Sequence, residues 1–331
     1  MRAMILDHQD KIENLPLKLK EIRTPEPSVN EVRIKVNTCG ICRTDLHIIE
    51  GDLPVHKLPL IPGHQIVGFI EKIGKNVQKF KINDRVGVPW LYKTCGTCFY
   101  CKHDKENLCE NALFTGYDVD GGYSEYFTIS ENYIYHLPEN YTDEEVAPFL
   151  CGGVIGYYAF TEARVEQGDK LGLFGLGSSA HITLQIAKHK GIDTYVVARK
   201  EKDFELAYEL GAKWSGKIEG LNEKLNSVIV FAPSGELMVN ALEKIIPGGR
   251  VVSAGIYASQ LPAFDYNHIY PEKSLTSIAN TTRANVKEFL KVASEFKIKT
   301  KINLYSLNDA NIALQNIKHS KVSGSSILKV F

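Results

Sequence analysis

The sequence has no excess of charge of either sign, because its 331 residues include 39 lysines and arginines and 39 aspartates and glutamates. Proteins that bind nucleic acid or a membrane surface usually carry a basic excess, so the balance argues against both. No apolar run reaches the roughly 20 residues that cross a bilayer. Residues 1–7 lack the apolar stretch of a signal peptide. We therefore expect a cytoplasmic protein with neither a nucleic-acid nor a membrane partner.

Cysteine is infrequent, with seven residues in the chain, but four of them are clustered. The cluster has the spacing C-x2-C-x2-C-x7-C and consists of Cys95, Cys98, Cys101 and Cys109. Four thiolates this close together can surround one ion tetrahedrally, as in structural zinc sites. Disulfide bridges or plain burial are the alternatives, but two-residue gaps suit a metal site better than bridges. The cluster predicts a structural zinc ion and a reducing compartment.

The length suggests about two domains. In residues 1–150, short strands are separated by turns rich in glycine, and the alternation of Val32, Ile34 and Val36 is typical of a half-buried strand. A glycine turn at Gly40 is expected to lead into a short helix. In residues 151–285 strands alternate with helices, which indicates a doubly wound parallel sheet. Residues 286–331 return to mixed helix and strand. The predicted class is α/β, with a Rossmann sheet and a β-rich domain.

A glycine-rich loop in the second region predicts dinucleotide binding. Residues 175–180 fit G-x-G-x-x-A between an expected strand and an expected helix, which is the context that this motif requires. Gly175 permits a tight turn, Gly177 lets the backbone approach a pyrophosphate, and Ala180 permits close packing of the helix. Ser178 and Ser179 begin that helix, whose N-terminus offers N–H groups to phosphate.

The end of the next strand bears on the choice of nucleotide. Ala198, Arg199 and Lys200 stand where an acidic residue normally binds the ribose hydroxyls of NAD. Two cations without a carboxylate favour NADP, although they can also be solvated surface residues, and Glu201 and Asp203 lie near enough to serve NAD. Backbone at later strand ends is expected to hold the nicotinamide, at Phe231, Gly255 and Ile256.

Two of the remaining cysteines can belong to a second metal site. We interpret Cys39 as a small buried residue. Cys42, Cys151 and His64 together would make two thiolates and one imidazole, which is an open catalytic zinc set with a fourth position for water or substrate. Their spacing alone does not decide this, because a turn histidine and a buried cysteine are also common.

These features occur in an order that resembles the zinc-dependent medium-chain alcohol dehydrogenases, in a bacterial and archaeal branch. The matching residues are 42–47, 63–65, the four-cysteine cluster, Cys151 and the loop at Gly175. The resemblance covers essentially the whole chain. It implies a GroES-like catalytic domain with both zinc sites at 1–150, a Rossmann domain at 151–285, and a return to the catalytic domain at 286–331. It also implies a homodimer or homotetramer.

The resemblance also assigns roles to a short segment. Thr44 matches the hydroxyl that takes the substrate proton, and His47 matches the group that passes the proton to solvent. Asp45 matches a carboxylate that orients the zinc-binding histidine, and Arg43 matches a residue that reaches the pyrophosphate. The implied reaction is reversible hydride transfer between an alcohol and NAD(P), with an aldehyde or ketone as the oxidised partner.

Two departures and two alternatives remain. Near the C-terminus, Ser325 stands where many relatives have an arginine that binds the pyrophosphate, so Arg43 is expected to carry more of that role. The family usually has glutamate after the histidine ligand, whereas this chain has Gln65. We hypothesise that losing this negative charge lowers the pKa of the bound alcohol. A polyol or sugar dehydrogenase is one alternative, but Cys151 and an apolar pocket disfavour it. The candidate pocket residues are Trp90, Leu91, Phe114 and Tyr117, which can equally be plain core residues. A non-catalytic zinc protein that binds nucleic acid is disfavoured by the neutral charge.

Overall fold

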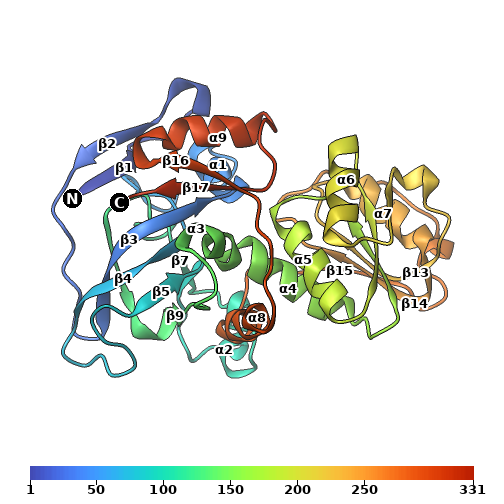
Figure 1. Cartoon of the computed structure of the whole chain (residues 1–331), viewed down its shortest axis with the longest axis horizontal. Helices are drawn as coiled ribbons and strands as arrows, with labels where there is room; N and C mark the ends of the chain where they lie inside the picture. Colours follow the sequence, from blue (N-terminus) through green and yellow to red (C-terminus); the bar gives the residue numbers. More distant parts are fainter. The chain divides into compact units, whose positions relative to one another are not determined.

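The computed structural model describes all 331 residues and divides them into two compact units. Unit 1 contains Met1–Cys151 and Asn280–Phe331, and unit 2 contains Gly152–Ala279. In Figure 1, unit 1 therefore carries both the blue N-terminal strands and the red C-terminal elements. The sequence placed the two crossings at 150/151 and 285/286, whereas the units of the structure divide at 151/152 and 279/280.

The main sheet of unit 1 has seven strands, in the order β16-β17-β3-β4-β5-β9 with β8 also paired to β3. Their bounds are β3 Glu31–Ile41, β4 Gln65–Ile73, β5 Arg85–Val88, β8 Tyr126–Ser130, β9 Tyr135–His136, β16 Ile302–Ser306 and β17 Ser325–Lys329. The C-terminal strand β17 lies antiparallel beside β3, as Figure 1 shows in red and blue. Residues 280–331 thus complete the sheet that residues 1–151 begin.

Strand β3 confirms the predicted alternation, because Val32, Ile34 and Val36 are fully buried. The predicted turn at Gly40 is wrong, however, because β3 continues to Ile41 and Gly40 pairs with Gln65 of β4. A Cβ atom on Gly40 would lie 2.6 Å from Oε1 of Gln65. The glycine therefore makes room for a neighbouring side chain rather than for a turn.

Smaller elements surround this sheet. Two hairpin-like pairs are β1 (Arg2–Leu6) with β2 (Leu17–Glu21) and β6 (Leu91–Lys93) with β7 (Leu113–Phe114). The α-helices are α1 Arg43–Glu50, α2 Phe99–Lys102, α3 Asp143–Val146, α8 Arg283–Glu295 and α9 Ala310–Lys318. Short 3-10 helices are η1 Ile12–Asn14, η2 Glu106–Leu108, η3 Glu131–Tyr133, η4 Ala147–Leu150 and η7 Leu307–Asp309. The core combines residues from both chain segments, for example Ile34, Ile70 and Leu314.

Unit 2 is a six-stranded parallel sheet in the order β12-β11-β10-β13-β14-β15. Its strands are β10 Lys170–Phe174, β11 Asp193–Val197, β12 Trp214–Gly216, β13 Leu225–Val230, β14 Ile245–Ser253 and β15 Ser274–Ser277. Its helices are α4 Gly152–Ala163, α5 Ser178–His189, α6 Glu201–Leu210, α7 Gly235–Lys244, and the 3-10 turns η5 Ile218–Gly220 and η6 Tyr266–His268. Counted along the chain this is the order 3-2-1-4-5-6 of a doubly wound Rossmann sheet, which confirms the predicted fold class.

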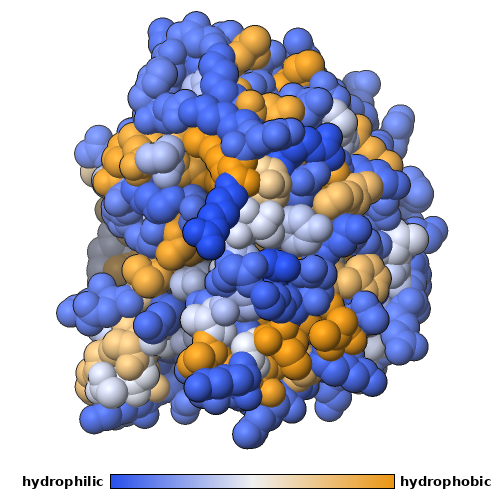
Figure 2. Space-filling model, turned by 90° about the vertical axis from the view of Figure 1, so that its left-hand side faces the viewer, coloured by the Kyte–Doolittle hydropathy of each residue, from blue (hydrophilic) through white to orange (hydrophobic).

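The face of the molecule drawn in Figure 2 is mostly hydrophilic, with hydrophobic residues gathered in several separate patches. None of the helices is both long enough and apolar enough to span a membrane.

Candidate active site

The carboxylate of Asp45 organises the N-terminus of α1. Cys42 is the N-cap residue, and its sulfur accepts a hydrogen bond from the backbone N–H of Thr44 at 3.3 Å. Oδ2 of Asp45 in turn accepts a hydrogen bond from the Cys42 N–H at 2.8 Å, which completes a capping box. Asp45 is fully buried, so the local sequence that starts this helix also fixes the position of the Cys42 thiol.

The same carboxylate orients His64. Oδ1 of Asp45 lies 3.1 Å from Nδ1 of His64, and Nε2 of this imidazole lies 3.4 Å from Sγ of Cys42. Cys151 follows η4 and supplies the third donor, and the three ligand atoms all lie within 4.8 Å of one another. Tetrahedral zinc with bonds of about 2.3 Å to sulfur and 2.0 Å to nitrogen would separate those two atoms by about 3.5 Å. The donor set and its spacing therefore fit zinc with one open position.

Proton affinities in this cluster follow from burial and from the close negative charges. Burial alone lowers the pKa of His64, but Asp45 and Cys42 outweigh it and raise the pKa to about 10. The hydrogen bond from Cys151, with the charge of His64, holds the pKa of Cys42 well below its usual range. The same pairing and burial raise the pKa of Cys151 well above its usual value. A divalent ion bound here would displace the protons that these thiols and the imidazole hold.

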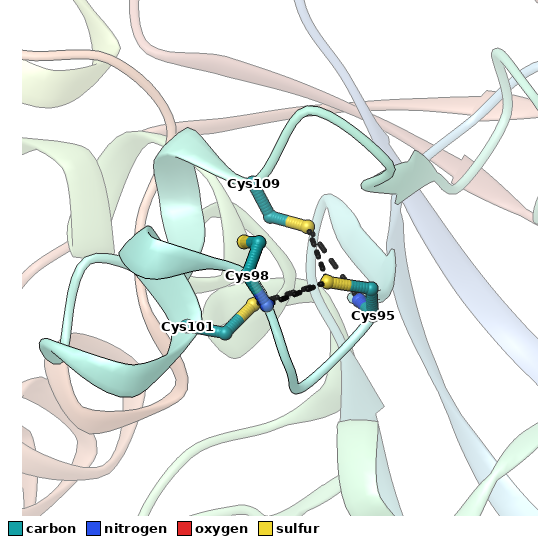
Figure 3. Close-up of side chains that lie close together, drawn as sticks. All are labelled: Cys95, Cys98, Cys101 and Cys109. Atoms are coloured by element: carbon teal, nitrogen blue, oxygen red, sulfur yellow. Dashed lines mark hydrogen bonds between the residues drawn. The ribbon is translucent and has the colours of Figure 1, made fainter.

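The four-cysteine cluster forms a second, separate centre in unit 1. Figure 3 shows the side chains of Cys95, Cys98, Cys101 and Cys109 gathered around one point, and their sulfurs all lie within 4.8 Å of one another. Sγ of Cys95 lies 3.9 Å from that of Cys101 and 3.6 Å from that of Cys109. Tetrahedral Zn–S bonds of about 2.3 Å separate sulfurs by about 3.8 Å, whereas a disulfide needs about 2.0 Å. The geometry fits a closed zinc site rather than bridges.

Backbone N–H groups prepare this centre for a cation. The N–H groups of Thr97 and Cys98 donate to Sγ of Cys95 at 3.5 and 3.3 Å, and these bonds lower the pKa of Cys95 to about 6. Burial raises the pKa of Cys109 to about 11, so this thiol needs a metal ion to lose its proton at neutral pH.

The glycine-rich loop of unit 2 has the geometry of a phosphate cradle. Gly175 follows β10 with φ +98°, a conformation that favours glycine, and its N–H donates to the carbonyl of Val197 at 2.7 Å. Gly177 is the N-cap of α5, and a Cβ atom there would meet nothing within 4 Å. Ala180, in the first turn of α5, is fully buried. The open space above Gly177, at a helix N-terminus, fits a pyrophosphate.

Comparison with known proteins agrees with this arrangement. Residues 28–139 match the family model described as alcohol dehydrogenase GroES-like domain, and residues 180–295 match that described as zinc-binding dehydrogenase. A probable alcohol dehydrogenase, AdhA, of Mycobacterium tuberculosis is 38% identical over 322 residues, which cover 95% of this chain and 93% of the relative. An alcohol dehydrogenase of Geobacillus stearothermophilus is 35% identical over the full length of both chains. The chain belongs to the zinc-dependent medium-chain alcohol dehydrogenases.

A solved structure extends the likeness to the fold. The CAD of Helicobacter pylori, complexed with NADP(H), superimposes with a TM-score of 0.90 at 26% identity, and the match covers 99% of this chain and 97% of that one. Like other members of its family, the chain has two zinc sites and uses a nicotinamide cofactor. The predicted fold class and family are confirmed.

The two residues of the predicted proton relay lie on one face of α1, because Thr44 and His47 are three positions apart. Thr44 is half-buried beside Cys42, while Nδ1 of His47 lies 2.7 Å from Oδ2 of Asp52, whose side chain is half exposed. One helix thus places Thr44 beside a metal ligand and His47 beside an exposed carboxylate. Arg43, at the first position of the same helix, is exposed.

An aromatic cluster lies against the histidine ligand. The ring of Trp90 meets that of His64 edge-on at 4.8 Å and stacks on Phe114 at 5.1 Å and on Tyr117 at 5.9 Å. Leu91, by contrast, is buried in the main core, so it is core rather than pocket. Three of the four apolar candidates therefore gather beside the metal ligands.

Gln65 and Cys39 are both buried close to the ligands. Gln65 follows His64 at the start of β4, and its Nε2 atom is buried without a hydrogen-bond partner. Cys39 is fully buried, as predicted, and burial raises its pKa well above the usual value. A neutral amide thus stands where a glutamate would place a further charge near two thiolates.

The other predicted nucleotide residues lie at the carboxyl ends of the parallel strands of unit 2. Ser178 and Ser179 form the first turn of α5, Ala198 follows β11, and Arg199 and Lys200 are exposed. Phe231 follows β13, and its N–H donates to the carbonyl of Phe174 at 2.9 Å. Gly255 and Ile256 follow β14, and Ile256 is 57% exposed. This edge of a doubly wound sheet is where ligands bind.

Sequence reasoning did not single out Asn280, which bonds to Trp90, or the ion pair of Glu106 with Arg283. The only local signal in that segment is a helix start, since Thr282 caps α8 together with Asn285. The partners are too distant in sequence for any spacing rule to connect them.

Proposed function

We propose that the protein catalyses reversible, zinc-dependent hydride transfer between an alcohol and NAD(P). The observation that carries this proposal is the convergence of Cys42, His64 and Cys151 with the buried carboxylate of Asp45 behind the imidazole. A closed structural site would have four protein ligands, whereas this one has three and leaves a position for substrate. Unit 2 supplies the phosphate loop that an oxidoreductase needs and a plain zinc-binding module does not.

The side chains divide the work as follows. When bound, zinc acidifies an alcohol oxygen as a Lewis acid and the nicotinamide accepts the hydride. Asp45 accepts the Nδ1 proton of His64, so the Nε2 lone pair is free to bind the ion that Cys42 and Cys151 would share. The Thr44 hydroxyl takes the substrate proton, and His47 passes it to solvent past Asp52. The side chains of Trp90 and Phe114 form a wall of the substrate pocket and exclude water from it.

The preferred nucleotide in this proposal is NADP. Arg199 and Lys200 are exposed directly after Ala198 and form no ion pair that would occupy their charge, so both are available to a 2′-phosphate. The Helicobacter pylori relative was crystallised with NADP(H), which supports the assignment. Glu201 and Asp203 in the first turn of α6 leave NAD as the second choice.

The proposed substrates are apolar alcohols and their aldehydes rather than polyols. The aromatic rings of Trp90, Phe114 and Tyr117 beside His64 offer few groups to bond several hydroxyls, and the third ligand is a cysteine rather than a glutamate. The general class thus corresponds to alcohol dehydrogenases that use NAD or NADP.

Assembly and location complete the proposal. We propose a homodimer or homotetramer, because β15 is an edge strand of the parallel sheet and exposed strand edges invite pairing with another chain. The seven cysteines form no disulfide, and thiolate ligands persist best in a reducing compartment, which supports a cytoplasmic location.

Steady-state kinetics with NADP and NAD test the proposal across aliphatic, aromatic and polyol alcohols, with zinc quantified in the same samples. The expected result is two zinc ions per chain, higher kcat/KM with NADP, and activity on aromatic or primary alcohols but not on sorbitol. Two bound zinc ions with no oxidation of any alcohol by either nucleotide would overturn it. A variant with Cys42→Ser should retain one zinc ion and lose activity.

A further inference from the structure

Asn280 is the first residue of unit 1 after the chain returns from unit 2, and it has a left-handed backbone with φ +54°. Among residues other than glycine, asparagine adopts this conformation most readily. Its side chain bridges two parts of unit 1: Oδ1 accepts from Nε1 of Trp90 at 3.1 Å, and Nδ2 donates to the carbonyl of Asn107 at 3.1 Å. A carboxylate would lack the donor and an aliphatic side chain would lack both groups.

From this bridge we infer that Asn280 is a positioning residue, which holds the indole of Trp90 against His64 and anchors it on the lobe that carries the structural zinc. The inference rests on the proposed function in one respect, which is that Trp90 forms part of the substrate pocket. Trp90 meets the His64 ring at 4.8 Å, while its backbone carbonyl accepts from the N–H of Thr115 at 2.9 Å. Backbone and ring are thus fixed separately, and Asn280 supplies the contact for the ring.

The anchor at the other end is firm. Asn107 belongs to η2 (Glu106–Leu108), which comes directly before the ligand Cys109. Glu106 of the same turn accepts from the N–H of Arg283 at 2.8 Å and pairs with its guanidinium at 2.8 Å. The Arg283 guanidinium also lies over the ring of Tyr133 at 5.1 Å. Two successive residues of η2 therefore hold the returning segment at Asn280 and Arg283.

Consequently the two metal centres are linked through few atoms. The link runs from Cys109 through η2 to Asn280, from Asn280 to Trp90, and from the Trp90 ring to His64. The closed zinc site then does more than stabilise the fold. It fixes the position of η2, which holds Asn280 and through it the Trp90 ring. The aromatic stack with Phe114 and Tyr117 follows the orientation of that ring.

Asn280→Gly tests the inference, because glycine keeps the left-handed backbone and removes both side-chain bonds. Asn83→Gly is the matched control: Asn83 also has a positive φ, of 72°, and is exposed in a turn away from the ligands. The chain has two tryptophans, Trp90 and Trp214. In a Trp214→Phe background, fluorescence reports on Trp90 alone and does not depend on activity.

We expect Asn280→Gly to shift the emission maximum of Trp90 and to raise KM for the alcohol about three- to tenfold, the range for one lost neutral hydrogen bond, with KM for the nucleotide unchanged. Asn83→Gly should change neither quantity. Asn280→Asp keeps an oxygen for Trp90 but sets a carboxylate oxygen against the Asn107 carbonyl, so its emission and KM should also move away from wild type. It also serves as the test should the glycine variant not fold.

Unchanged Trp90 emission in both Asn280 variants would overturn the inference, as would emission and KM changes of equal size in Asn83→Gly. A double-mutant cycle combines Asn280→Gly with Trp90→Phe. The second change removes the indole N–H that donates to Asn280. The effects of the two changes on kcat/KM should be less than additive, and strict additivity would count against the bond. A wild-type protein without alcohol oxidation would refute the proposed function, while the emission arm would still decide the position of Trp90.

Discussion

Oδ1 of Asp45 lies 3.1 Å from Nδ1 of His64, and the other oxygen of the same carboxylate accepts the N–H of Cys42 at 2.8 Å. One buried side chain therefore sets the direction of two metal ligands that stand 22 residues apart in the chain. Asp45 thus caps α1 and orients the imidazole of His64 with the same carboxylate.

Replacing this carboxylate should weaken catalytic zinc binding. In Asp45→Asn the amide keeps the shape but loses the charge, and removal of such partners of ligands typically lowers metal affinity about 10–100-fold. Chelator competition followed by zinc analysis measures the effect. The exposed control Asp7→Asn should behave as wild type, and an unchanged affinity in Asp45→Asn would contradict the role given to this carboxylate.

Zinc uptake should strengthen as pH rises. The Asp45 and Cys42 charges raise the pKa of His64 to about 10 in the metal-free protein. Below that pH the imidazole holds a proton that the ion must displace, so apparent affinity should increase from pH 6 to pH 8. Competition with a chelator of known pH behaviour tests this, and an affinity independent of pH would show that no ligand holds a proton in this range.

Loss of one cysteine of the closed site should lower zinc content from two ions to one. Cys98→Ser removes a ligand of the four-cysteine centre and leaves Cys42, His64 and Cys151 intact. We expect a lower melting temperature as well, because structural zinc contributes directly to folding. Cys39→Ala is the control, since Cys39 belongs to neither centre. This variant should keep both ions even if the loss of a buried side chain lowers its melting temperature.

Nucleotide preference should respond to the cations after β11. Arg199→Gln is expected to raise KM for NADP about tenfold or less while KM for NAD stays the same, since one exposed charge-assisted hydrogen bond contributes modestly. Lys75→Gln removes the same charge from unit 1 and should leave both values unchanged. Equal rises in the KM values for NADP and NAD would show that Arg199 contacts a group that both nucleotides share, and not the 2′-phosphate.

The Gln65→Glu variant tests the departure from the family pattern. A carboxylate at this buried position adds negative charge near the metal ligands, which should raise the pKa of the bound alcohol and move the pH–rate profile for alcohol oxidation to higher pH. Gln78→Glu, on the exposed surface, is the control. A profile that does not move would show that residue 65 has no electrostatic part in the reaction.

Local patterns carried the sequence analysis furthest. The four cysteines lie within 15 residues, and the Gly175 loop lies between its own strand and helix, so spacing and context sufficed for both. Cys42, His64 and Cys151 were different, because only the order known from a family joined them. The pairing of β3 with β4 brings Cys42 and His64 together, and Cys151 reaches them at the end of η4; periodicity alone reveals neither contact.

Other features depended on packing that no local rule describes. Gly40 was taken for a turn because glycine is a turn signal, yet it lies in β3 where the Gln65 side chain needs its space. Asn280 was overlooked because its partners Trp90 and Asn107 lie 190 and 173 residues away. The short strand β15 was also missed, since its three half-buried residues and one exposed residue give no clear alternation.

The division of the chain has an evolutionary consequence. All seven metal ligands belong to unit 1, with Cys151 as its last residue before the first crossing, whereas the nucleotide loop belongs to unit 2. Substitutions within residues 152–279 can thus alter which coenzyme is accepted while the ligand shells stay intact. A lineage with this architecture is free to change its electron carrier and its metal chemistry independently.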